Sequence, residues 1–257
     1  MEKGFIFFPE SKVISNPGEL GIPFEDLTIS TEDGVDLNAW FVPFKKSRKT
    51  LLWFHGNAGN IGDRVDYLQL LHRKLKLNIL IIDYRGYGRS GGEVSEEGTY
   101  RDARAAYDYL LTRTDIDTSR IIFLGRSLGA AIAVDLATHI LPLGLILEAP
   151  FTSIKEMAGV VLPWLPVGRF LATKYDSLSK IDRIQIPLLI MHGDHDSVVP
   201  YRQGEKLFDA ANEPKQFFTI EGADHNDSYI VGGDAYFKTM SRFIDRLESP
   251  APLLRQH

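Results

Sequence analysis

The 257-residue sequence contains no cysteine. This absence excludes disulfide bridges, thiolate catalysis, cysteine-ligated zinc and iron–sulfur clusters. It is compatible with a reducing compartment. A chain of this length can bury well over half of its surface, so it does not depend on such cross-links to form a core.

The sequence also lacks long apolar runs and basic clusters. No stretch approaches 18 apolar residues, so we expect no transmembrane segment. Phe5–Phe8 is apolar but is ended by Pro9, which makes it too short for the core of a signal peptide. The net charge is −5, and the densest basic stretch is 45–49. Nothing in this charge pattern predicts a nucleic-acid partner.

Strand-like and helix-like stretches alternate along most of the chain. Such alternation predicts an α/β fold with a mostly parallel sheet and helices on both faces. A hairpin signal over 24–43, centred on Glu32-Asp33-Gly34, adds an antiparallel N-terminal pair. We expect one domain over 1–257. The expected strands after the hairpin are Thr50–Phe54, Asn78–Ile82, Ile121–Leu124, Leu143–Leu147, Ile186–Met191 and Gln216–Ile220.

The segment 151–184 interrupts this alternation. It is apolar but contains Pro163 and Pro166, which break a single long helix. We interpret it as a short lid over the active edge of the sheet; an ordinary crossover helix with irregular ends is the alternative. As a lid it would contribute Trp164 and Leu165 to a substrate pocket, which favours an acyl group of moderate length.

Polar side chains follow each expected strand. Right-handed crossovers place the C-terminal ends of parallel strands at one edge of the sheet, where ligands bind. We therefore expect residues that are far apart in sequence to converge there. They are His55, Arg85, Ser127, Glu148, Asp196 and His225.

The stretch around Ser127 has the pattern of a nucleophile elbow. An apolar strand leads into Gly125-Arg126-Ser127-Leu128-Gly129, and small helix formers follow at once. In such a turn the serine hydroxyl is exposed at the sheet edge, and the two glycines allow the strand and the helix to pass closely. The alternative is a tight turn with a serine that has no chemical role.

A serine hydroxyl needs a base, and the base needs an orienting carboxylate. His225 follows the last expected strand and can reach Ser127. Asp196 follows the preceding strand, which gives the chain order Ser, acid, His of this arrangement. Asp194 and Glu148 are rival candidates for the acid. The other six histidines fit structural positions or are less favoured: His55, His72, His139, His192, His195 and His257.

A tetrahedral oxyanion needs two N–H donors. Leu128 offers the first, directly after the nucleophile. We expect the second from Asn57, because Gly56 and Gly59 let that loop turn its N–H groups inward. His55 opens the same loop; we expect it to support the turn and to border the substrate pocket.

Two other patterns suggest ligands but are disfavoured. Gly86-x-Gly88-x-x-Gly91 matches a dinucleotide fingerprint, but the following helix begins late and arginines crowd the turn. The stretch 192–196 contains His and Asp residues, but adjacent ligands without a partner cluster elsewhere do not make a metal site. We expect neither a cofactor nor a metal.

In combination these motifs resemble the α/β-hydrolase superfamily, over nearly the whole chain. They are similar to a small-lid branch that includes membrane-anchored eukaryotic serine hydrolases, some of them protein depalmitoylases, and bacterial relatives. The resemblance implies Ser127 as nucleophile, Asp196 and His225 as its partners, and Asn57 with Leu128 at the oxyanion. The eukaryotic relatives carry an upstream anchor. This chain begins at the domain, so we expect a cytoplasmic protein unless an anchor was removed.

The sequence therefore predicts a serine hydrolase acting on small acyl esters or thioesters through an acyl-enzyme. A peptidase of the dipeptidyl or acylaminoacyl type is the closest alternative, because the same triad cleaves amides. A catalytically silent binding protein on this scaffold is a further alternative. The oligomeric state does not follow from the sequence.

Overall fold

A computed structural model describes residues 3–161 and 171–247. Its framework is an eight-stranded sheet with the order β1-β2-β4-β3-β5-β6-β7-β8. This is the mostly parallel sheet of the α/β-hydrolase fold, which confirms the predicted fold class. The strands are β1 Glu25–Ser30, β2 Asp36–Val42, β3 Thr50–Phe54, β4 Asn78–Ile82, β5 Ile121–Arg126, β6 Gly144–Glu148, β7 Leu188–Gly193 and β8 Lys215–Ile220.

The predicted N-terminal hairpin is present and antiparallel. β1 pairs with β2, and β2 pairs antiparallel with β4, which joins the hairpin to the parallel strands. From β4 to β8 all neighbours are parallel. Every residue of β3, β4 and β6 is buried, as expected for strands that helices cover on both faces.

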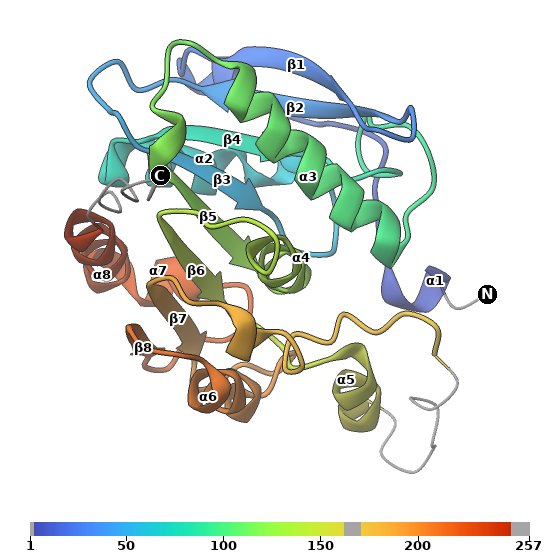
Figure 1. Cartoon of the computed structure of the whole chain (residues 1–257), viewed down its shortest axis with the longest axis vertical. Helices are drawn as coiled ribbons and strands as arrows, with labels where there is room; N and C mark the ends of the chain where they lie inside the picture. Colours follow the sequence, from blue (N-terminus) through green and yellow to red (C-terminus); the bar gives the residue numbers. More distant parts are fainter. Residues whose placement is uncertain (1–2, 162–170, 248–257) are drawn as a thin grey trace, which may run out of the picture.

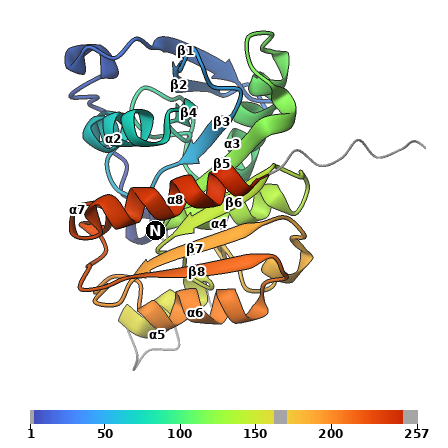
Figure 2. The ribbon, with the colours of Figure 1, turned by 90° about the vertical axis from the view of Figure 1, so that its left-hand side faces the viewer.

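Helices cover both faces of the sheet (Figures 1 and 2). α2 and α8 pack on one face and α3, α4 and α6 on the other, and each face has its own apolar cluster. The helices are α1 Lys3–Ile6, α2 Val65–Leu75, α3 Glu96–Thr112, α4 Leu128–Ala137, α5 Ile154–Val161, α6 Tyr201–Ala210, α7 Ser228–Val231 and α8 Gly233–Arg246, with 3₁₀ turns η1 Pro17–Leu20, η2 Ile61–Arg64, η3 Thr118–Arg120 and η5 Ile181–Arg183.

The segment between β6 and β7 contains α5 and η5. Its central part, 162–170, lies outside the described residues, and Trp164 and Leu165 lie there. The role of 151–184 as a lid therefore stays a prediction. Among the described helices, none combines the length and the apolar character needed to cross a membrane.

The turn between β5 and α4 depends on two glycines. A Cβ atom at Gly129 would lie 2.1 Å from the carbonyl oxygen of Phe54, and one at Gly125 would lie 2.4 Å from the carbonyl oxygen of Gly129. Both obstacles are backbone atoms, so no side-chain rotation relieves the clash. The predicted close crossing of strand and helix is present at this turn.

We expect Gly129→Ala to destabilise the protein severely. The added methyl group would push α4 away from β3, and such overpacking against backbone costs about 3 kcal/mol or more. Urea unfolding should show a lower midpoint or no cooperative transition.

Gly159→Ala is a matched control, because a Cβ there meets no atom within 4 Å. Gly159 lies inside α5. Alanine at this position should stabilise by about 0.5–1 kcal/mol through helix propensity. An unfolding midpoint for Gly129→Ala equal to that of the unmodified protein would contradict the packing argument.

Candidate active site

Ser127 occupies the turn between β5 and α4 in a strained conformation. Its φ of 52° and ψ of −114° are unusual for a residue with a side chain. Its N–H donates to the carbonyl oxygen of Glu148 at 2.9 Å, which ties the turn to the end of β6. α4 begins at the next residue, Leu128, so the helix N-terminus points at this position. The geometry is that of a nucleophile elbow.

The structure brings His225 and Asp196 together. Nδ1 of His225 lies 2.8 Å from Oδ2 of Asp196. Both side chains are buried, at 9% and 1% exposure. His225 comes from the loop after β8, and Asp196 from the loop after β7, as the sequence order predicts. A carboxylate in this position can fix the ring orientation and stabilise an imidazolium.

Asp196 is held by further contacts. Its Oδ1 accepts the N–H groups of Val198 and Val199 at 2.9 and 2.7 Å, and its Oδ2 lies 3.3 Å from Nε2 of His192. Burial by itself would raise the pKa of Asp196. Hydrogen bonds from His192 and His225 outweigh that effect and hold the pKa well below its usual range. Asp196 is therefore ionised at neutral pH.

The two rival acids have other partners. Asp194 is exposed, and its Oδ1 accepts the N–H of Gly222 at 2.7 Å. Glu148 is buried and lies 3.4 Å from Nε of Arg126. Of the three candidate acids, Asp196 is thus the one whose carboxylate contacts the imidazole of His225.

The Ser127 hydroxyl makes no hydrogen bond with any described residue, His225 included. Its contact with the imidazole therefore stays a prediction. Catalytic hydrogen bonds are often long in unliganded enzymes and tighten with substrate. The turn and the histidine loop are nonetheless adjacent, because Nη2 of Arg126 donates to the carbonyl oxygen of His225.

The 55–60 loop lies beside this turn. A methyl group built on Gly56 would lie 3.7 Å from Cβ of Ser127. Within the described chain, neither the N–H of Asn57 nor that of Leu128 donates to another group. Both predicted oxyanion donors are thus unpaired, and their assignment stays a prediction.

The N-terminal segment crosses the 55–60 loop and orders it. The side chain of Asn57 donates to the carbonyl of Ile6 and accepts from Phe8 N–H at 3.3 Å and from Tyr87 OH at 2.8 Å. Pro9 forms a parallel bridge with Gly59. These contacts fix the backbone on which the Asn57 N–H lies.

His55 begins this loop, and its side chain is buried beneath the loop. Its side chain has no exposure, and its ring packs on Tyr84 and Tyr87 with centroids 4.5 and 5.7 Å away. Nδ1 lies 2.7 Å from the carbonyl of Gly56. These contacts support the turn. Because the His55 side chain has no exposed surface, it offers no surface to an acyl pocket.

Asp83 lies next to His55 in the same buried layer. Oδ1 of Asp83 accepts the N–H of Ile61 at 2.9 Å and lies 3.6 Å from Nε2 of His55. Burial raises the pKa of Asp83 to about 7. Burial, and the charge of Arg64, lower the pKa of His55 to about 3. Both groups are therefore neutral in mildly acidic solution.

The raised pKa of Asp83 predicts that the contribution of this group to the free energy of unfolding falls as the pH rises. An unfolded aspartate titrates near pH 4, so from about pH 4 to 7 the folded protein binds more protons than the unfolded chain. Stability from this group is fully present below that window and is lost through it. Asp83→Asn removes the titration. Relative to the unmodified protein, the variant should gain at least ~1 kcal/mol between pH 5 and pH 8.

Urea unfolding at both pH values measures this gain. Asp108→Asn, which removes a carboxylate with 47% exposure, controls for the loss of one negative charge. An Asp83→Asn difference that is the same at pH 5 and pH 8 would show that Asp83 does not titrate in this range.

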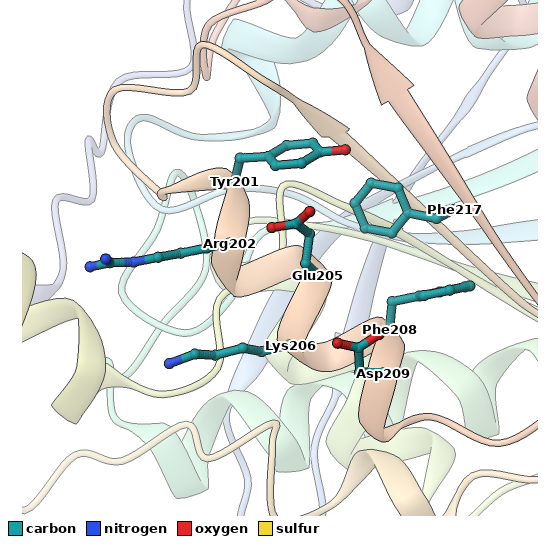
Figure 3. A pocket seen from close by; sticks show the side chains of 7 residues that line it. All are labelled: Tyr201, Arg202, Glu205, Lys206, Phe208, Asp209 and Phe217. Atoms are coloured by element: carbon teal, nitrogen blue, oxygen red, sulfur yellow. The ribbon is translucent and has the colours of Figure 1, made fainter.

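A hollow of about 490 Å³ lies elsewhere on the surface, along α6 and the edge strand β8 (Figure 3). It contains none of the predicted site residues. Charged side chains of both signs line it together with aromatic rings: Tyr201, Arg202, Glu205, Lys206, Phe208, Asp209 and Phe217. It therefore contributes nothing to the chemistry predicted at the sheet edge.

Sequence reasoning missed two features of the site. It grouped His192 with the histidines that are structural or less favoured; His192 lies 2.9 Å from the carbonyl oxygen of Val199, and its second contact, to Asp196, was not predicted. It also treated Arg126 as an unspecified position of the Gly-x-Ser-x-Gly pattern. An arginine between two small residues at a buried turn was the available signal for an ion pair.

Comparison with known proteins places the chain among hydrolases. Residues 68–246 match the prolyl oligopeptidase family. The chain is 37% identical over 250 residues to the α/β-hydrolase domain-containing protein WAV2 of Arabidopsis thaliana, covering 90% of this chain and 81% of WAV2. It is 34% identical over 240 residues to protein bem46 of Schizosaccharomyces pombe, covering 90% and 80%.

A bacterial relative and a solved structure extend the comparison. An uncharacterised Mycobacterium tuberculosis protein is 37% identical over 245 residues, covering 95% of this chain and 87% of that protein. The esterase Pf2001 of Pyrococcus furiosus superposes with a TM-score of 0.79 at 21% identity, covering 93% and 99%. At this identity the likeness to the esterase concerns the fold.

Proposed function

Because the chain belongs to the prolyl oligopeptidase family of α/β-hydrolases, we propose that it is a serine hydrolase of carboxylic esters or thioesters. Ser127 is the nucleophile, His225 the base and Asp196 the residue that orients it. Family and fold make the chain a hydrolase; the triad and the ester or thioester preference are the proposal.

The hydrogen bond between His225 and Asp196 carries this proposal. It joins two loops at the carboxyl edge of the sheet, and Arg126 links the histidine loop to the turn of Ser127. A buried, ionised carboxylate behind an imidazole is costly to maintain without a partner that becomes charged. In a triad the imidazolium formed during acylation is that partner.

The proposed reaction has two halves. The Ser127 oxygen attacks the acyl carbonyl, and Nε2 of His225 takes the hydroxyl proton. Collapse of the tetrahedral intermediate breaks the bond to the leaving group, which receives that proton from the imidazolium. A water molecule then gives a proton to His225, attacks the acyl-enzyme and releases the acid, and the proton returns to Ser127.

The N–H groups of Asn57 and Leu128 stabilise the oxyanion. Both belong to rigid backbone, one in the loop crossed by the N-terminal segment and one at the start of α4. One such donor contributes roughly 3–4 kcal/mol to lowering the barrier.

A fluorophosphonate probe tests whether the serine is activated. The protein should be labelled, and Ser127→Ala should not. Absence of labelling in the unmodified protein, under conditions where a known serine hydrolase reacts, would reject the proposal and favour a silent binding protein.

Parallel substrates test the leaving group. We expect turnover of p-nitrophenyl esters and acyl-CoA thioesters, with a preference for moderate acyl length. Amide cleavage is the second candidate function, because the matching family is named for a peptidase. Faster cleavage of aminoacyl anilides than of esters, with no dependence on acyl length, would favour that candidate.

A further inference from the structure

Arg126 lies between the parts of the candidate site. It is the residue before Ser127, and its side chain is 14% exposed. Nη2 donates to the carbonyl oxygen of His225 and to Oδ1 of Asn226, the latter at 3.2 Å. A methyl group built on Gly56 would lie 3.7 Å from Nη1. The guanidinium thus touches the histidine loop and lies along the 55–60 loop.

The other side of the guanidinium meets a buried acid. Nε of Arg126 lies 3.4 Å from Oε1 of Glu148, which is 1% exposed. Oε2 of Glu148 accepts from Tyr236 OH at 2.8 Å and from Tyr67 OH at 3.4 Å, and the two hydroxyls contact each other. These partners come from β6, α8 and α2, so the arginine is anchored to the core on the face of the sheet that α2 and α8 cover.

Electrostatics support a fixed charge at Arg126. Burial by itself would lower the pKa of Arg126, and the attraction of Glu148 more than compensates. Burial, reinforced by Glu148, raises the pKa of both Tyr67 and Tyr236 well above the usual value. The tyrosines therefore remain donors at any working pH, and the network presents one oriented cation to the histidine loop.

We propose that Arg126 is a positioning residue that holds His225 in register with Ser127. Asp196 fixes Nδ1 of the ring, and Arg126 fixes the backbone carbonyl of the same residue, so His225 is held both at its ring and at its main chain. Among described residues, Arg126 makes the side-chain hydrogen bonds that join the nucleophile turn to the histidine loop. The inference rests on the proposed function.

Substitution of both charges separates positioning from stability. Arg126→Met alone leaves the Glu148 carboxylate buried without its cation, which is destabilising. Adding Glu148→Gln removes that charge, so the double variant should recover most of the lost stability. Its kcat/KM should nevertheless stay about 10²-fold below that of the unmodified protein, with the loss in kcat, because a displacement of ~1 Å has this effect on a reacting group.

Arg113→Met is the matched control. Arg113 is 11% exposed and pairs with Glu25 and Asp115 at 2.8 and 2.7 Å. It lies just after α3, before the start of β5, and so at the end of the sheet opposite to Ser127. We expect the Arg113→Met substitution to lower the free energy of unfolding without changing kcat/KM.

A second readout does not depend on turnover. The Nδ1 proton of His225, held by Asp196, should give a downfield ¹H NMR signal that is absent from Asp196→Asn. In the folded Arg126→Met/Glu148→Gln variant this signal should broaden or disappear, because a loosely held ring exchanges its proton with solvent.

Three outcomes would overturn the inference. They are an unchanged kcat/KM in the folded double variant, a raised KM with unchanged kcat, which would assign Arg126 to substrate binding, and a reduced rate with an unchanged imidazole signal. Failure of the unmodified protein to react with the probe rejects the proposed function instead, while the NMR comparison still tests the link between Arg126 and His225.

Discussion

Ser127→Ala should reduce kcat by roughly 10⁶-fold, the loss seen when the nucleophile of such a triad is removed. The alanine variant keeps the elbow and the Asp196–His225 pair but has no atom to form the acyl-enzyme. Substrate binding and the oxyanion donors should still let the Ser127→Ala variant hydrolyse the ester faster than the uncatalysed reaction in water. Ester hydrolysis with purified protein and an active-site titration measure the effect. Ser119→Ala, in η3 before β5, is the control for a lost serine hydroxyl and should have the unmodified rate.

The same position also tests backbone strain. Glycine accepts the observed φ of 52° and ψ of −114° more easily than a residue with a Cβ. Ser127→Gly should therefore be more stable than Ser127→Ala by about 1 kcal/mol in urea unfolding, although both are inactive. A residual kcat in Ser127→Ala within tenfold of the unmodified rate would remove Ser127 from the mechanism.

Asp196→Asn should lower kcat by roughly 10⁴-fold without unfolding the protein. An asparagine can keep the shape of the site, but its amide favours the wrong tautomer of His225 and gives no charge to stabilise the imidazolium. The two N–H groups of Val198 and Val199 can still bind the remaining oxygen. The pH dependence of kcat/KM and the unfolding midpoint should be recorded together.

Glu148→Gln is the natural comparison, since both carboxylates are buried near the nucleophile. Glu148 meets Arg126 and not His225, so we expect a loss of about tenfold or less. A larger loss in Glu148→Gln than in Asp196→Asn would reverse the assignment of the acid.

Much of the scaffold could be predicted because local signals agree with the fold. α3 begins at Glu96 because Ser95, a residue type that favours helix starts, accepts the N–H of Gly98 at 3.1 Å and caps the helix. The elbow could be predicted from Gly125 and Gly129, since the motif itself encodes the close crossing. Strand order along the chain then placed Asp196 and His225 at one edge.

The remainder depends on contacts that have no periodicity in the sequence. The pairing of Pro9 with Gly59 joins segments 50 residues apart through backbone atoms. The contact of His192 with Asp196 and the ion pair of Arg126 with Glu148 exist because the folded sheet brings these side chains together. Some expected strand ends differ by one or two residues from the structure, as at β7, where the apolar run begins at Ile186 before the first paired residue and the pairing continues through His192 and Gly193.

The N-terminal contacts have a practical consequence for biochemical work. The first strand of the sheet begins at Glu25. A truncated protein that starts at residue 13 therefore keeps all eight strands and should still express and unfold cooperatively. It would nevertheless lose the acceptor that Ile6 offers to Asn57 and the donor that Phe8 supplies. A well-behaved but inactive truncation would therefore say little about substrate choice, and screening should retain residues 3–12.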